Sequence, residues 1–170
     1  MSDYRIPFIG RGHAYTDEEI QVAVNAMTTA IPLSQGEYQE EFQEKFGRLT
    51  GAKHAFALNN ATSALEISAQ ICQFKPGDEV IIPAHTFTAS AYPFLKNGAK
   101  IVWADIDLST RVVTVETIQC CITPNTKAIV VVHLYGFAAN MPAIMEIAGR
   151  YSLEVVEDAA QAILASIDGK

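Results

Sequence analysis

The sequence predicts an α/β fold in which a mainly parallel sheet carries helices on both faces. Two observations support this class. Short runs of β-branched and apolar residues alternate with helical segments from about residue 54 onward. The runs are apolar on both sides of the predicted strand, which is typical of strands buried between two layers of helices.

The first 50 residues predict two helices. Thr16 and Glu19 have the spacing of a capping box, in which a hydroxyl and a carboxylate satisfy open main-chain amides at a helix start. The second helix is expected to end at Gly51, because glycine tolerates the left-handed conformation that closes many helices. Its apolar stripe consists of Tyr38, Phe42, Phe46 and Leu49.

The remaining chain predicts five strands and four helices. The expected strands are 54–58, 79–82, 100–104, 127–133 and 153–157. The expected helices are 62–73, 86–97, 115–122 and 141–151. Pro142 favours a helix start at that point, since the proline nitrogen has no hydrogen to satisfy. Ligands of parallel sheets bind beyond the carboxyl ends of the strands. Chemistry is therefore expected at 59–63, 83–89, 133–140 and 157–161.

Composition narrows the class of protein. The 170 residues fit one ordinary domain or part of a larger one, and 49% hydrophobic residues suffice for a packed core. The net charge is −7, and no basic run is present, so neither nucleic acid nor an anionic membrane is an expected partner. The apolar run 128–132 is too short to cross a bilayer. The N-terminus does not have the order of residues that a signal peptide has.

Cysteine usage points to a reducing compartment. The number of cysteines is odd, and the three residues, Cys72, Cys120 and Cys121, show no CxxC spacing. We therefore expect neither a disulfide framework nor a zinc site. The expected location is the cytoplasm.

Two of the strand ends carry residues with two interpretations each. The turn at 59–63 leads into a helix whose open amides and dipole favour an anion such as phosphate, but Asn60 or Thr62 could simply cap that helix. Phe87 either covers a planar ligand or belongs to the core. His85 is either a titrating group or a surface or capping residue. The residues alone favour the structural interpretation in all three cases.

The other two strand ends carry Asp158 and His133. Asp158 directly follows a predicted strand, where a buried carboxylate needs a partner that no neighbouring residue provides. That partner could be a ligand, or Asp158 could cap a helix. His133 is expected to be structural, because no metal-ligand spacing accompanies it. The motifs GxGxxG, GxxxxGK[ST], HExxH and GxSxG are absent, so dinucleotide, P-loop, zincin and hydrolase functions lose their main support.

Four segments in fixed order give the chain a family resemblance. They are IPLSQGEYQEEFQEKFGRLTGAKHAFALNNATSALEI, PGDEVIIPAHTFTASAYPFLKNGAKIVWADID, TPNTKAIVVVHLYGFAANMPAIMEIAGRY and LEVVEDAAQAILA. From about Ile6 onward the chain resembles the DegT/DnrJ/EryC1/StrS sugar aminotransferases, which depend on pyridoxal 5′-phosphate (PLP). The order of all four segments, rather than any one of them, makes the resemblance specific.

The resemblance implies a cofactor-binding role for five residues. Ala61 and Thr62 match the pair that holds the cofactor phosphate, although alanine replaces the commoner glycine and has less backbone freedom. Phe87 matches the aromatic residue that stacks on the pyridine ring. Asp158 matches the carboxylate that pairs with the ring N1–H, and Gln161 matches the side chain near O3′.

The resemblance also implies the fold and the function. The fold is that of the fold-type-I PLP transferases, with an N-terminal arm and helix at 1–30 and an incomplete PLP-binding large domain at 31–170. The function is amino transfer from glutamate or glutamine to a nucleotide-linked keto-sugar, and the full-length protein is expected to be a homodimer.

The family's Schiff-base lysine is expected beyond the chain end, so no catalytic residue is assigned. Lys170 is too close to Asp158 to be that lysine. We therefore expect a truncated, inactive N-terminal portion. Two alternatives stay open. One is a dehydratase of the same family, in which histidine replaces the lysine. The other is a non-catalytic remnant or one half of a split protein.

Overall fold

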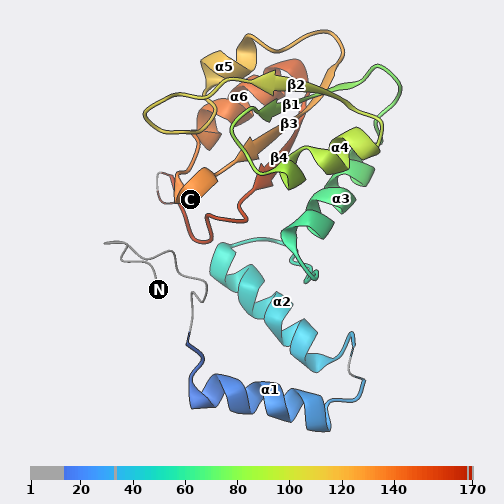
Figure 1. Cartoon of the computed structure of the whole chain (residues 1–170), viewed down its shortest axis with the longest axis vertical. Helices are drawn as coiled ribbons and strands as arrows, with labels where there is room; N and C mark the ends of the chain where they lie inside the picture. Colours follow the sequence, from blue (N-terminus) through green and yellow to red (C-terminus); the bar gives the residue numbers. More distant parts are fainter. Residues whose placement is uncertain (1–13, 33, 168, 170) are drawn as a thin grey trace, which may run out of the picture. The chain divides into compact units, whose positions relative to one another are not determined.

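The computed structural model describes residues 14–32, 34–167 and 169. The chain divides into two compact units, Met1–Ala57 and Leu58–Lys170, here called the N-terminal and C-terminal units (Figure 1). The expected division into an arm at 1–30 and a large domain at 31–170 stays a prediction, and residues 1–13 lie outside the described residues.

The N-terminal unit contains the two predicted helices, α1 (Asp17–Thr29) and α2 (Glu37–Thr50). The capping box before α1 is present: the Glu19 N–H donates to Thr16 Oγ1 at 3.2 Å, and the Thr16 N–H donates to Glu19 Oε2 at 2.7 Å. Gly51 ends α2 in the left-handed region, with φ 70°. Both helix-boundary predictions are confirmed.

The strand expected at 54–58 was wrong, because this segment has no regular secondary structure. One of its amides, the Ala57 N–H, donates to the side-chain oxygen of Gln43 at 2.9 Å, and Phe56 is 81% exposed. A strand is stable only when a neighbouring strand accepts its main-chain hydrogen bonds. No described strand pairs with this segment, and its apolar pattern does not reveal whether a partner is present.

The C-terminal unit is built on a four-stranded sheet with the order β2-β1-β3-β4, and every neighbouring pair is parallel. The strands are β1 (Glu79–Pro83), β2 (Lys100–Ala104), β3 (Thr126–Val132) and β4 (Glu154–Asp158). Four of the five expected strands are thus confirmed to within one residue at each end. The parallel arrangement brings the ends of β1, β3 and β4 to one edge of the sheet.

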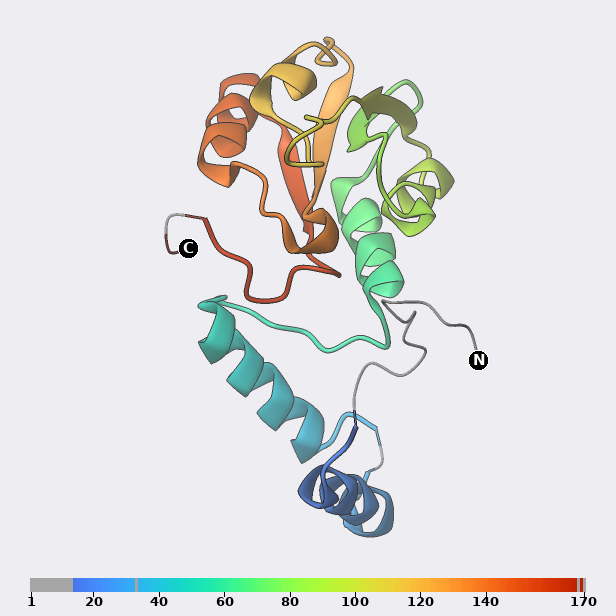
Figure 2. The ribbon, with the colours of Figure 1, turned by 60° about the vertical axis from the view of Figure 1, so that its left-hand side comes forward.

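Helices cover both faces of this sheet (Figure 2). On one face α3 (Ala61–Cys72) and α4 (Tyr92–Lys96) pack against Val80 and Ile82 of β1. On the other face α5 (Val115–Gln119) and α6 (Met141–Tyr151) pack against Ile81. Successive side chains of a strand point to opposite faces, so one apolar strand serves both cores. The predicted fold class is confirmed.

The helix expected at 86–97 was wrong in its first half. The structure has a 3₁₀ turn, η1 (Thr88–Ser90), and the separate short helix α4. Pro93 is the reason, because a proline inside a continuous helix would clash with the carbonyl of Ala89, four residues earlier. Pro93 instead occupies the first turn of α4, where it is tolerated. A second 3₁₀ turn, η2 (Leu134–Gly136), follows β3.

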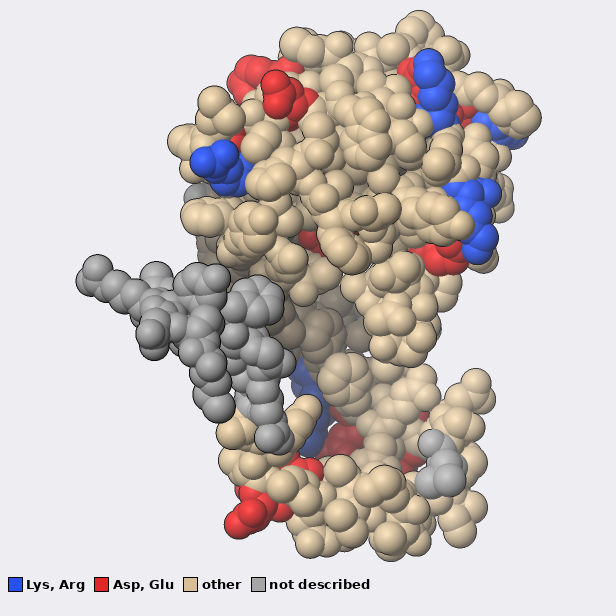
Figure 3. All heavy atoms as spheres, in the orientation of Figure 1, with Lys and Arg blue, Asp and Glu red and all other residues tan. Residues whose placement is uncertain are grey.

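Two further observations concern the distribution of basic side chains and the length of the apolar helices. On the face of the molecule in Figure 3, the lysine and arginine side chains stand apart from one another and form no basic patch. Among the described residues, no helix combines the length and the apolar composition needed to cross a bilayer.

An ion pair between the buried Glu79 carboxylate and the exposed Lys100 side chain makes the stability of the C-terminal unit depend on pH. Glu79 is 5% exposed, and its carboxylate accepts from Lys100 Nζ at 2.8 Å and from the Thr123 hydroxyl. These hydrogen bonds, Lys100 first, hold the pKa of Glu79 below its ordinary value. A depressed folded-state pKa contributes stability above the unfolded pKa, about 4.3, and that stability is lost as the pH falls through the folded value.

We therefore expect Glu79→Gln to lower the free energy of unfolding at pH 7, and the difference from wild type to shrink progressively below about pH 4. Urea titrations at a series of pH values measure this difference. Glu154→Gln, at an exposed position on β4, is the control. A Glu79→Gln deficit that stays constant from pH 7 to pH 3 would contradict the assigned role of the ion pair.

Candidate functional site

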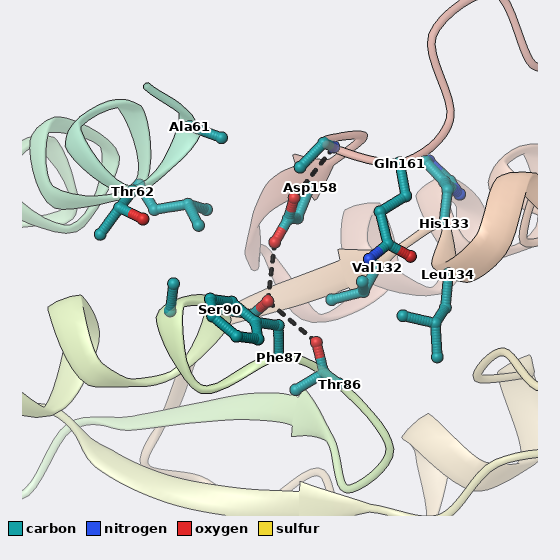
Figure 4. A pocket seen from close by; sticks show the side chains of 13 residues that line it. Ala61, Thr62, Thr86, Phe87, Ser90, Val132, His133, Leu134, Asp158 and Gln161 are labelled. Carbon is teal, nitrogen blue, oxygen red and sulfur yellow. Dashed lines mark hydrogen bonds between the residues drawn. The ribbon is translucent and has the colours of Figure 1, made fainter. Parts of the chain in front are cut away.

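A pocket of about 170 Å³ lies at the carboxyl edge of the sheet (Figure 4). Residues from the start of α3, the turn after β1 and the ends of β3 and β4 line it. The five residues singled out in the sequence are all among them: Ala61, Thr62, Phe87, Asp158 and Gln161. All belong to the C-terminal unit. The structure thus brings together residues that lie up to 100 positions apart in the chain.

The N-terminus of α3 forms one end of the pocket. Asn60 is the N-cap, and its Oδ1 accepts from the Ser63 N–H at 2.8 Å. The capping interpretation is therefore correct for Asn60. Within the described part of the chain, the N–H groups of Ala61 and Thr62 have no hydrogen-bond partner. Two open amides and the positive end of a 12-residue helix remain available to an anion.

Phe87 does not belong to the core, since its side chain is 70% exposed. It immediately precedes η1, whose last residue, Ser90, is buried, as is Ala91 directly after it. This turn directs the aromatic ring toward the pocket instead of the sheet (Figure 4). The surface that it offers is large, flat and apolar.

Asp158 is the last residue of β4 and is only 8% exposed. Its Oδ2 accepts from the Ser90 hydroxyl at 2.7 Å, and its Oδ1 accepts from the Ala160 N–H at 3.1 Å. Among the described residues no helix begins after Asp158, so the helix-cap alternative was wrong. The partner that the local sequence did not provide is Ser90, 68 residues earlier.

Sequence reasoning missed both Ser90 and the residue behind it, Thr86. The Thr86 hydroxyl lies 2.8 Å from Ser90 Oγ and donates to it. Small hydroxyl residues in a turn usually bond to the nearby main chain, so their presence alone carries no functional signal. The one available hint was that a buried carboxylate after β4 needed a donor from elsewhere in the fold.

The Gln161 side chain is hydrogen-bonded to Tyr135, a residue that does not line the pocket. Its Oε1 accepts from the main-chain N–H of Tyr135 at 3.0 Å, at a position where the backbone is left-handed, with φ 56°. Because the oxygen is engaged, the side-chain amide nitrogen is the group left to donate to a ligand. Val132 and Leu134 line the same pocket (Figure 4).

The two histidines near the pocket have different surroundings. His133 is buried; its Nδ1 accepts from the Ala139 N–H at 3.1 Å, so the proton is on Nε2, which donates to Glu157 Oε2 at 3.1 Å. These bonds support the structural role expected for His133. His85 packs edge-on against the Tyr135 ring, with centroids 6.0 Å apart, and its Nδ1 is buried without a partner in the described structure.

The charged groups of the pocket are few. Asp158 and His133 are the titratable side chains among its described lining residues, and neither lysine nor arginine occurs there. The described residues contain no cluster of three or more His, Cys, Asp or Glu side chains that could hold a metal ion. A ligand would therefore meet open amides at one end, an aromatic face, and a carboxylate anchored by neutral donors.

Comparisons with known proteins show what the chain is similar to. The chain is 41% identical over 152 residues to GDP-perosamine synthase of Caulobacter vibrioides, covering 89% of this chain and 41% of that protein. It is 37% identical over 153 residues to the UDP-N-acetyl-3-dehydro-alpha-D-glucosamine 3-aminotransferase of Acidithiobacillus ferrooxidans, covering 90% of this chain and 42% of that enzyme.

A solved structure is also similar to this chain. NtdA of Bacillus subtilis with bound cofactor PMP matches with a TM-score of 0.81 and 34% identity, covering 90% of this chain and 36% of that one. The chain thus spans about two fifths of the length of the curated relatives described above. The partial fold-type-I architecture that the resemblance implied is confirmed.

The family assignment follows from the sequence profile, the relatives and the fold together. The profile of one family matches residues 14–170, which is nearly the whole chain. The chain belongs to the DegT/DnrJ/EryC1/StrS aminotransferase family.

Proposed function

We propose that the chain forms the N-terminal part of a PLP-dependent aminotransferase that moves an amino group from glutamate or glutamine to a nucleotide-linked keto-sugar. The observation that supports this most is that Ala61, Thr62, Phe87, Asp158 and Gln161 all line one pocket. A relative whose name specifies a UDP-linked dehydro-sugar and an aminotransferase supports the substrate class.

The residues of the pocket fit PLP at each of its polar ends. The open amides of Ala61 and Thr62 suit the phosphate, since they can donate directly and lie at the positive end of a helix. The buried carboxylate of Asp158 suits the N–H of a protonated pyridine ring. The free amide donor of Gln161 suits the ring oxygen O3′.

Each residue then has a distinct task. When bound, PLP supplies an electron-withdrawing ring for the carbon that loses its proton during amino transfer. Asp158 keeps a proton on the ring nitrogen, which preserves that electron-withdrawing character. Phe87 fixes the plane of the ring and excludes water from one face. Ala61 and Thr62 hold the phosphate and thereby the position of the ring.

The described lining residues include no lysine, and the family resemblance implies that the group that bonds the cofactor and moves the substrate proton comes from elsewhere in the complete protein. Lys170 itself lies outside the described residues. On this proposal, we expect the chain alone to bind the cofactor without a covalent bond and not to transaminate.

The carboxylate can be tested through binding alone. We expect Asp158→Ala to weaken the binding of pyridoxamine 5′-phosphate to the chain about tenfold or more, because a hydrogen bond to a charged group is lost. Isothermal titration calorimetry measures the affinity. Asp105→Ala removes an exposed carboxylate outside the pocket and should bind like wild type. Equal affinities for all three proteins would remove Asp158 from the proposed site.

The absence of a covalent attachment point can be tested by chemical trapping. The chain is mixed with PLP, reduced with borohydride and mapped by mass spectrometry for modified lysines. We expect scattered or absent labelling and no turnover of an amino donor, since losing the nucleophile and base costs more than the roughly 10²–10⁴-fold of one acid–base group. Specific labelling of Lys170 together with turnover would overturn this expectation.

The complete protein is proposed to be a homodimer, as the fold-type-I resemblance implies, and to be cytoplasmic, as its cysteine usage indicates. Sites of this fold lie between two subunits, so the dimer would be required for activity. Analytical ultracentrifugation of the full-length protein at micromolar concentration is expected to give the mass of two chains. A monomer at that concentration would contradict the assembly without affecting the assignment of the pocket.

A further inference from the structure

We propose that Ser90 is a positioning residue, whose hydroxyl fixes the orientation of the Asp158 carboxylate toward the ring nitrogen of the bound cofactor. The inference rests on the proposed function, because the ring nitrogen is the group that the carboxylate would face. The resemblance of the sequence to the family assigned no role to Ser90. Its role is inferred from its contacts with Asp158 and Thr86.

The direction of the hydrogen bonds is set by chemistry. An ionised carboxylate only accepts, so the single hydroxyl proton of Ser90 is donated to Asp158 Oδ2, at 2.7 Å. Ser90 Oγ is then free to accept the proton of the Thr86 hydroxyl, at 2.8 Å. Figure 4 shows the resulting chain from Thr86 through Ser90 to Asp158. Each bond in such a chain polarises the next one.

Two anchors on different oxygens determine how the carboxylate is turned. The torsion that rotates an aspartate carboxylate is broad and has no sharply preferred value of its own. The Ala160 N–H holds Oδ1 at 3.1 Å, but one bond leaves rotation about that anchor. The Ser90 hydroxyl on Oδ2 removes this freedom. Each oxygen keeps a second lone pair, so a ligand N–H can still be accepted from the pocket.

Ser90 is also built into the turn that presents the aromatic ring. It is 1% exposed, and its N–H donates to the Phe87 carbonyl at 2.9 Å within η1. One turn therefore carries both the side chain proposed to cover the ring and the hydroxyl that orients the carboxylate. A residue placed only to stabilise η1 would need its main-chain bond but not the bond to Asp158.

The test follows the ring nitrogen of the ligand directly. Pyridoxamine 5′-phosphate labelled with ¹⁵N in the ring is added to saturation to the whole chain. This amine forms no Schiff base with surface lysines. The pH at which the bound ring nitrogen loses its proton is read from its ¹⁵N chemical shift, and affinity is measured calorimetrically. His133, the other titratable lining residue described, is present in every variant.

We expect Ser90→Ala to lower the pH of ring deprotonation and to weaken binding about tenfold, because the carboxylate no longer faces the ring in one orientation. Ser90→Thr keeps the hydroxyl and should restore both values. Ser68→Ala is the matched control: that hydroxyl donates to the Ala64 carbonyl within α3 and does not line the pocket. It should leave both values unchanged.

The outcomes separate the inference from the function on which it rests. If Asp158→Ala weakens binding but Ser90→Ala matches wild type in affinity and ring titration, the positioning role is overturned and the proposed function stands. A Ser90→Ala protein that is only less stable to heat, with an unchanged ring titration, also overturns it. If the wild-type chain does not bind the ligand at all, both proposals fall.

Discussion

Parallel strand pairing is the constraint on which the candidate site depends. Because β1, β3 and β4 run in the same direction, each leaves the sheet at the same edge, and Val132 is paired with Asp158 at that edge. Segments far apart in sequence are thereby brought to one place, beyond the carboxyl ends of the strands. A register shift of one residue on β4 would move Asp158 to the opposite face of the strand, away from Ser90. The two apolar cores, one on each face, keep the register fixed.

Features that depend on neighbouring residues could be predicted from the sequence, and features that depend on distant ones could not. The cap at Thr16, the stop at Gly51 and the helix beginning beside Pro142 involve groups within a few positions of one another, and each is present. The bond between Ser90 and Asp158 joins groups that only the folded sheet brings together. The sequence indicated that Asp158 needed a donor, but any hydroxyl, amide or cation in the chain would have satisfied that need. The cofactor roles of the five candidate residues were assigned through the family resemblance, although the strand-end rule had already pointed to the segments that contain them.

The two largest errors in secondary structure, at 54–58 and at 86–97, have different physical causes. At 54–58 a short apolar run suggested a strand, but no described strand offers the hydrogen bonds that a strand requires. At 86–97 the apolar spacing favoured one helix, and a single residue, Pro93, prevented it from forming. The second error mattered more for the site. A continuous helix would have carried Phe87 and Ser90 on a regular helical surface, whereas the break leaves them in a turn, where one side chain is exposed to the pocket and the other is buried against Asp158.

The start of α3 shows that a structural and a functional interpretation of the same turn can both hold. Asn60 caps the helix by satisfying one amide, that of Ser63, and its own backbone is extended. A helix start exposes more amides than one cap can satisfy. The amides of Ala61 and Thr62 precede Ser63 and remain open in the described structure. Moreover, the cap draws the Asn60 side chain onto the helix end, which fixes the direction of those two amides. Capping therefore does not compete with binding an anion here, because it orients the donors that an anion would use.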